Sequence, residues 1–118
     1  MKKYILIIAI LLSGNTVLGK QSDETHRLNE LLHDAILAEN HDLIKERVES
    51  GANINGRRSH NWTPLMFATF SCANPETIQL ITTLGGDPSL LDSDNKTAYM
   101  IATEECPRLL PYLRIPTS

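Results

Sequence analysis

Concentrated positive charge is absent from this 118-residue sequence, in which 11 lysines and arginines face 14 aspartates and glutamates. Beyond the first three residues, Arg57 and Arg58 are the one pair of adjacent basic side chains. Nucleic acid and anionic membrane surfaces are bound by a concentrated basic face, so neither is expected as a partner.

Motifs that carry catalysis are also absent. The sequence has no glycine-rich phosphate loop and no GxSxG segment around a nucleophilic serine. The histidines lack the paired spacing of a zinc site and are spread along the chain: His26, His33, His41 and His60. The acidic pairs Asp92 with Asp94 and Glu104 with Glu105 are typical of solvated faces. We therefore expect no enzyme activity, no catalytic residue, no metal and no cofactor.

Long apolar runs are limited to residues 4–12 (YILIIAILL), which follow Lys2 and Lys3 and precede Ser13 and Gly14. A basic start, a short apolar run and a small residue, here Gly19, are the features of a secretory signal peptide. The alternative is a membrane anchor, but crossing a bilayer takes roughly 20 helical residues. We expect residues 1–19 to be cleaved after Gly19.

Cleavage there would leave residues 20–118 as one small domain with a net charge of about −5, since two of the 11 basic residues leave with the signal. No second apolar run approaches membrane length. The expected location is the periplasm or the medium, without stable membrane insertion after cleavage.

A repeat with a period in the low thirties is what the chain does contain. Ala35, Ala68 and Ala102 lie 33 and then 34 residues apart, and a spacing of 34 also relates Thr63 to Thr97. Periods of this length are typical of stacked supersecondary units, which act through an extended surface.

Helical periodicity and capping residues divide the chain into short helices. The expected ranges are 21–40, 41–49, 64–71, 75–84, 98–103 and a short or kinked helix over 108–113. Thr63, Asn74 and Thr97 stand at N-cap positions, and Gly51 and Gly85 stand where a left-handed C-cap favours glycine. The prediction is an all-α solenoid of three helix-turn-helix units (about 23–55, 56–89 and 90–118) with extended finger-like connections.

The segments TPLMFA (63–68), ETIQLITTLGGDPS (76–89), AILAENHDLIKERVESGANIN (35–55) and DNKTAYMIA (94–102) resemble ankyrin repeats. The resemblance covers about residues 26–113. Met66 and Met100 replace the histidine that usually follows Thr-Pro-Leu, and the last unit stops early. The resemblance implies a protein-binding scaffold whose concave face is made by the first helix of each unit and by the fingers.

On the ankyrin pattern, Ala68 and Thr69 point inward and the groove is lined by side chains of all three units. The expected partner-binding residues there are Phe67, Phe70 and Ser71 in the second unit, Leu37 with Asp34 and Ala38 in the first, and Ile101, Glu104 and Glu105 in the third. Exposed rings are costly in water, which favours a partner site. The alternative is that one or both phenylalanines pack back onto the stack as core.

The first finger adds candidate binding residues, and the second offers Leu90, Leu91, Asp92 and Lys96. The candidates of the first finger are Arg57, Arg58, His60 and Trp62. Trp and Arg are frequent interface hot spots, but Trp62 could equally cover the neighbouring repeat. Arg57 and Arg58 are expected to give the fingers a positive edge, and Glu104 and Glu105 a negative edge to the groove.

Cysteine is scarce, since Cys72 and Cys106 are the two in the chain and occupy equivalent places of successive units. Export favours their oxidation. Closing the loop of about 34 residues between them would stabilise the fold by about 4 kcal/mol. Neighbouring helices, however, pack 8–10 Å apart, whereas bridged Cα atoms usually lie below about 7 Å. We expect a disulfide, with two free thiols as the alternative.

The favoured function is an exported protein-binding module, an inhibitor or immunity-type protein that blocks another protein. The alternatives are an accessory factor that supports a periplasmic enzyme and a secreted effector directed at a host. The sequence identifies neither the partner protein nor the oligomeric state, so a dimer stays open.

Overall fold

A computed structural model describes the backbone of residues 17–114 and the side chains of residues 23–114. The α-helices are α2 (Val17–Leu37), α3 (His41–Glu49), α4 (Pro64–Phe70), α5 (Pro75–Thr83) and α6 (Ala98–Glu105), and the 3-10 helices are η1 (Ser59–Asn61) and η2 (Pro107–Tyr112). Within residues 17–114 there is no β-strand. The predicted signal peptide falls mostly on residues 1–16, outside the described residues. None of the helices described is long and apolar enough to span a bilayer.

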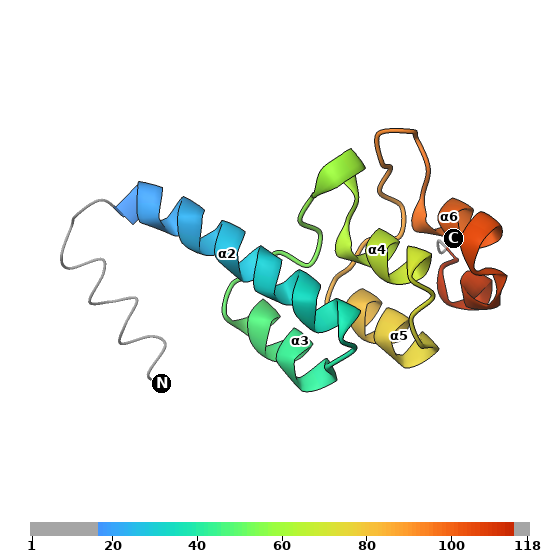
Figure 1. Cartoon of the computed structure of the whole chain (residues 1–118), viewed down its shortest axis with the longest axis horizontal. Coiled ribbons are helices and arrows are strands. Elements are labelled where there is room, and N and C mark those ends of the chain that lie inside the picture. Colours follow the sequence, from blue (N-terminus) through green and yellow to red (C-terminus); the bar gives the residue numbers. More distant parts are fainter. Residues whose placement is uncertain (1–16, 115–118) are drawn as a thin grey trace.

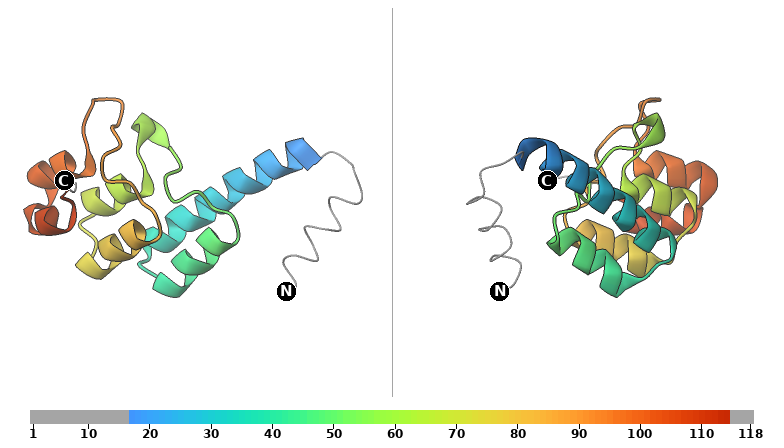
Figure 2. Two further views of the ribbon diagram at one scale, coloured as in Figure 1. Left: turned by 180° about the vertical axis from the view of Figure 1, so that it is seen from behind. Right: turned by 60° about the vertical axis from the view of Figure 1, so that its left-hand side comes forward.

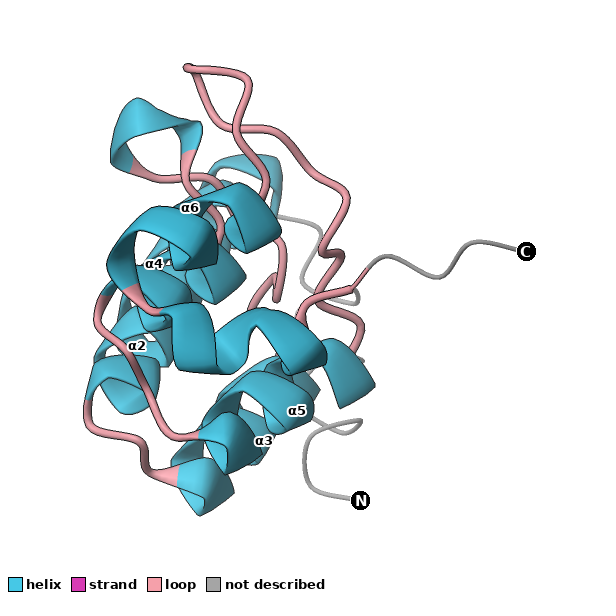
Figure 3. Ribbon diagram, turned by 90° about the vertical axis from the view of Figure 1, so that its right-hand side faces the viewer, coloured by secondary structure: helices cyan, strands magenta, loops and turns pink. Residues whose placement is uncertain are grey.

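The helices form two layers of a short stack (Figure 1). Each unit pairs two antiparallel helical segments, α2 with α3, α4 with α5 and α6 with η2, and α4 contacts both α2 and α6. Seen along the stack, α2, α4 and α6 lie behind one another in one layer, with α3 and α5 beside them (Figure 3). Two loops rise on one side of the stack in the views of Figure 2. We call residues 57–62 the first finger and residues 90–96 the second finger.

The recurring alanines explain the period of the sequence. Ala35, Ala68 and Ala102 are 4%, 0% and 0% exposed, one on each helix of the first layer. Small side chains at these places allow the helix backbones to approach closely. Larger aliphatic side chains fill the space between the layers: Leu32, Ile36, Ile44, Leu65, Ile78, Ile81, Leu109 and Leu113.

Helix starts follow the predicted caps, with one difference. The hydroxyl oxygens of Thr63 and Thr97 accept hydrogen bonds from the backbone N–H groups of Met66 and Met100, each at 3.3 Å. The buried sulfur of Met66 lies 3.4 Å from the backbone nitrogen of Thr63, so it completes the cap from the position where the family has histidine. Asn74 is at the N-cap of α5, but its side chain makes no capping hydrogen bond.

The helix ends at Gly51 and Gly85 also agree with the prediction. Their φ angles are +116° and +106°, a region that residues with a Cβ rarely adopt. Backbone N–H groups around each glycine bond back to the last helical turn, as Gly85 does to Thr82 and Gly86 does to Ile81. The last helix is a 3-10 helix with Pro111 inside it, in agreement with the short or kinked helix expected.

Cys72 and Cys106 form a disulfide, and their Cα atoms lie 5.6 Å apart. The two cysteines lie at disulfide distance, as the prediction requires, and the objection from helix spacing does not apply. Cys72 lies in the turn between α4 and α5 with φ +59°, and Cys106 lies in the turn before η2. Turns can approach more closely than the axes of the helices that they connect.

Glu39 joins the first unit to the second. Its Oε1 atom accepts hydrogen bonds from the backbone N–H of Asn74 at 2.8 Å and from the hydroxyl of Thr77 at 2.7 Å. Because Thr77 donates its proton to Glu39, its oxygen accepts from Nε2 of His41, 2.9 Å away. A carboxylate of the first unit thus satisfies the first turn of α5, where negative charge is favoured.

These contacts predict an acid-sensitive contribution to stability. The bonds from Thr77 and Asn74, with smaller effects of His41 and Arg108, hold the pKa of Glu39 below its ordinary value of 4.5. Its stabilisation is therefore complete above pH 4.5 and is lost as the pH falls through the lower pKa of the folded state. Glu39→Gln should cost about 1 kcal/mol at pH 7, with no difference between the two proteins at the acid end. Urea denaturation between pH 2.5 and 7 measures this, and a constant difference over that range would contradict it.

Candidate functional site

The exposed side chains of the first layer form one surface, which we call the α2–α4–α6 face. It consists of Leu37, Ala38, Phe70, Ser71, Glu104 and Glu105, which take the same two positions in successive units. Leu37 and Phe70 are each 51% exposed. The expectation that these side chains face solvent is confirmed, while their binding of a partner stays a prediction. Along the stack, the face changes from apolar to acidic.

Phe67 and Ile101 do not belong to this face in the way expected. The Phe67 ring is half-buried, with edge contacts to the rings of His33 at 4.6 Å and Trp62 at 4.9 Å. Ile101 is 4% exposed and packs in the core. Only Asp34, at the equivalent place of α2, is exposed. The expected exposure was wrong for Ile101, because an aliphatic side chain at this position is buried by packing, and it was half right for Phe67. Whether either side chain contacts a partner stays a prediction.

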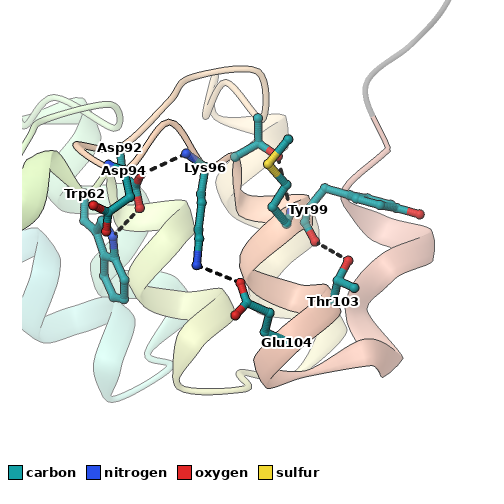
Figure 4. Close-up of polar contacts among 9 residues, drawn as sticks. Trp62, Asp92, Asp94, Lys96, Tyr99, Thr103 and Glu104 are labelled. Atoms are coloured by element: carbon teal, nitrogen blue, oxygen red, sulfur yellow. Dashed lines mark hydrogen bonds and ion pairs between the residues drawn. The ribbon is translucent and has the colours of Figure 1, made fainter.

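Trp62 covers the neighbouring repeat. Its indole N–H donates to Oδ2 of Asp92 in the second finger, at 2.9 Å. Its ring centroid lies 5.2 Å from that of Phe70. Figure 4 shows the indole nitrogen pointing toward the Asp92 carboxylate. Trp62 therefore connects the two fingers and packs against the ring of Phe70.

Asp92 organises the second finger, a role that the sequence analysis missed. Its Oδ1 atom accepts from the backbone N–H groups of Asp94 at 2.8 Å and Lys96 at 2.9 Å. Asp92 is 6% exposed, so its assignment to a solvated face is wrong. Burial disfavours its charge, but the bonds from Lys96, Asp94 and Trp62 outweigh burial and hold the pKa of Asp92 below its ordinary value. An aspartate whose carboxylate accepts from the backbone N–H two residues later is a known turn signal. The segment D-S-D-N, which begins at Asp92, contains this signal.

Of the two arginines of the first finger, Arg58 is paired with an acid, whereas Arg57 stays exposed and bonds only to neutral carbonyls. Arg57 donates to the backbone carbonyls of Asn61 at 2.7 Å and Leu91 at 2.6 Å, which ties the two fingers together. Arg58 forms an ion pair with Glu30, and its guanidinium lies 6.0 Å from the centroid of the Phe67 ring. Glu30, on α2, compensates the charge of Arg58. The sequence of the finger alone does not indicate this pairing.

Two of the histidines, His60 and His33, make contacts within the fold. His60 is exposed at the tip of the first finger with φ +60°, and its carbonyl accepts from the backbone N–H of Ser93 at 3.0 Å. His33 is buried beside Phe67; burial and then the nearby Arg58 lower its pKa, which favours the neutral ring. In the described part of the chain, no three His, Cys, Asp or Glu side chains are placed to hold a metal ion.

A hollow of about 100 Å³ lies where the second finger meets α4 and α6, and we call it the finger hollow. It is lined by Trp62, Phe70, Asp92, Asp94, Lys96, Ile101, Glu104 and Glu105. The Nζ atom of Lys96 lies 2.8 Å from Oε1 of Glu104. Figure 4 shows this ion pair. This ion pair, together with Asp94 and Asp92, raises the pKa of Lys96. The hollow thus brings one ammonium group and four carboxylates together beside two aromatic rings.

No protein-family model matches the chain. It is 32% identical over 83 residues to ankyrin repeat, SAM and basic leucine zipper domain-containing protein 1 of Mus musculus, covering 70% of this chain and 17% of the relative. It is 33% identical to the E3 ubiquitin-protein ligase KEG of Arabidopsis thaliana (62% and 4%) and 32% identical to the human 2-5A-dependent ribonuclease (63% and 10%).

The chain thus spans less than a fifth of the length of these curated relatives. The ligase and ribonuclease activities in two of the names belong to much longer proteins and are not transferred to this chain. What the relatives share with it is the repeat, and ankyrin repeats generally serve as modules that contact other proteins. The described helical stack is accordingly an ankyrin-repeat solenoid, and its relatives support a place for this chain in the ankyrin-repeat family as a protein-interaction module.

Proposed function

We propose that this protein is an exported module that binds one partner protein on its α2–α4–α6 face and blocks it, as an inhibitor or immunity-type protein does. The observation that carries the proposal is the exposure of Leu37 and Phe70, each 51%, at equivalent places of adjacent helices. Covering large apolar side chains of this kind contributes roughly 1.5–3 kcal/mol per residue when burial is complete. Apolar side chains gathered on one face are typical of a binding surface.

The blocking role is supported by the exposed apolar side chains on one face and by the small size of the domain. An inhibitor acts by occupying its partner, which requires a stable surface and no chemistry. The export on which this role depends rests on the predicted signal peptide of residues 1–19. The same surface would also suit an accessory factor of a periplasmic enzyme or a host-directed effector.

Cellular observations distinguish these roles. An inhibitor protects cells against one specific toxin. Deleting an accessory factor produces a phenotype with no toxin present. An effector is found in the medium or inside host cells.

Binding through the face is tested with tagged residues 20–118 and the variant Leu37→Asp/Phe70→Asp, each exposed to periplasmic extract and to culture supernatant. We expect a stoichiometric partner whose affinity falls at least about thirtyfold in the variant, as the loss of an interface hot spot does. Phe67 is left unchanged because it is half-buried between His33 and Trp62.

Tyr112→Asp is the matched control, since Tyr112 is 38% exposed on η2, outside the face. A partner that binds the face variant and the wild type equally well would contradict the proposal. The identity of a partner that is lost from the face variant alone would select among the inhibitor, accessory and effector roles.

A further inference from the structure

We propose that the finger hollow receives a lysine or arginine side chain of the bound partner, so that the partner presents a basic residue close to an apolar one. This inference rests on the proposed function, because it assigns the chemistry of the partner that the α2–α4–α6 face binds. It follows from three features of the hollow: its charge, its aromatic wall and its position on the face.

The charge of the hollow is unbalanced. Glu104 is paired with Lys96 at 2.8 Å, and the Asp92 carboxylate is enclosed by its three N–H donors. Asp94 and Glu105 are exposed, and neither forms an ion pair with another side chain of the described part of the chain. The hollow therefore already holds one ammonium group and keeps negative charge for a second cation.

The aromatic wall is suited to the same group. Trp62 and Phe70 line the hollow, and the bond from the Trp62 indole to Asp92 fixes the orientation of that ring. Cations bind over aromatic faces within about 6 Å of the centroid. The chain uses this contact elsewhere, where the Arg58 guanidinium lies 6.0 Å from the centroid of Phe67. A guanidinium or ammonium entering the hollow would meet a ring and carboxylates together.

The position of the hollow on the face sets the spacing between the basic and the apolar residue of the partner. Phe70 belongs both to the apolar part of the face and to the hollow. Neighbouring helices pack 8–10 Å apart, and an extended strand rises about 3.3 Å per residue. An apolar side chain of the partner over Leu37 and Phe70 would thus stand roughly three extended residues from the basic side chain in the hollow.

A small probe tests the hollow without the partner. The purified, isotope-labelled protein is titrated with N-acetyl-arginine amide and, separately, with its neutral isostere N-acetyl-citrulline amide, while NMR follows each N–H signal. The arginine probe should shift the indole signal of Trp62 and the backbone signals of Phe70 and Glu105 to saturation, more weakly at high salt. The citrulline probe should leave them unchanged.

Two variants should change the affinity for the arginine probe in opposite directions. Asp94→Asn/Glu105→Gln should weaken it by about fivefold, and Lys96→Met should strengthen it by about fivefold, because it removes a cation and frees Glu104. Asp23→Asn/Glu24→Gln, which alters exposed carboxylates on α2 away from the hollow, is the control and should leave the affinity unchanged.

Equal responses to the arginine and citrulline probes, or a Lys96→Met variant that binds the arginine probe no better, would overturn the inference. Such a result leaves the proposed function standing if the pull-down partner is still lost from the Leu37→Asp/Phe70→Asp variant. A hollow that binds the arginine probe as expected, beside a pull-down partner that ignores the face variant, would instead contradict the proposed function alone.

Discussion

Removal of the Cys72–Cys106 bond, by Cys72→Ala/Cys106→Ala, should lower the free energy of unfolding by about 4 kcal/mol. The bond joins residues 34 positions apart. Cross-linking a loop of this length lowers the entropy of the unfolded chain and so raises the free energy of the unfolded chain by about 4 kcal/mol. For a domain of fewer than 100 residues, the midpoint of thermal unfolding should fall on the order of 20 °C. Thermal and urea denaturation followed by circular dichroism measures both quantities.

The bond also secures the short last unit. That unit has a 3-10 helix in place of a second α-helix, and it is held to the second unit by Leu109 and Leu113 in the core and by Arg108, which donates to the backbone carbonyls of Cys72 and Ala73. Terminal repeats are stabilised on one side only. Loss of the cross-link should therefore expose the amides of α6 and η2 to hydrogen exchange before those of α2 and α3.

The control for the disulfide prediction is the unaltered protein, compared before and after chemical reduction. Its reduced form should match the double alanine variant, and its unreduced, denatured form should show no free thiol. Reduced and oxidised proteins of equal stability would contradict the prediction, as would two titratable thiols in the unreduced protein.

The parts of the fold that repeat could be predicted from the sequence. Ala35, Ala68 and Ala102 mark the close contacts of the first layer, and Thr63 and Thr97 start α4 and α6 in the way that local chemistry requires. Caps and periodic apolar faces depend on residues within a few positions of each other, so both can be recognised in the sequence alone. The ends of the helices were correct to within a few residues for the same reason.

The fingers could not be predicted to the same depth, because distant residues decide their conformation. The ion pair of Arg58 with Glu30 and the bond of Trp62 to Asp92 join positions 28 and 30 residues apart. The first finger also contains a turn in which His60 and Asn61 have positive φ angles, which no pattern in R-R-S-H-N-W indicates. Charge, burial and exposure in the candidate site follow from these pairings. The sequence alone therefore did not show that Arg58 is paired with Glu30, and it did not reveal the finger hollow.

Asp92→Ala should destabilise the protein by about 3 kcal/mol, more than a typical surface substitution. The substitution leaves three N–H groups without their acceptor, those of Asp94, Lys96 and the Trp62 indole. A buried donor left unsatisfied costs about 1–3 kcal/mol, and water can reach the exposed turn at Asp94 and compensate part of the loss. Urea denaturation measures the change, and Asp94→Ala, at an exposed carboxylate of the same finger, is the matched control.

A double-mutant cycle separates the two functions of the Asp92 carboxylate. Asp92→Asn keeps the oxygen that accepts from the backbone of Asp94 and Lys96 but places an amide N–H against the indole N–H, so it should cost about 1 kcal/mol. In a Trp62→Phe background that conflict is gone, and the same substitution should cost little. Trp62 is the one tryptophan of the chain, so its fluorescence also reports whether Asp92→Asn releases the ring into water. Equal costs in both backgrounds would mean that Asp92 shapes its own turn alone, and the two fingers would then be held together by the bonds from Arg57 to Leu91 and from Ser93 to His60.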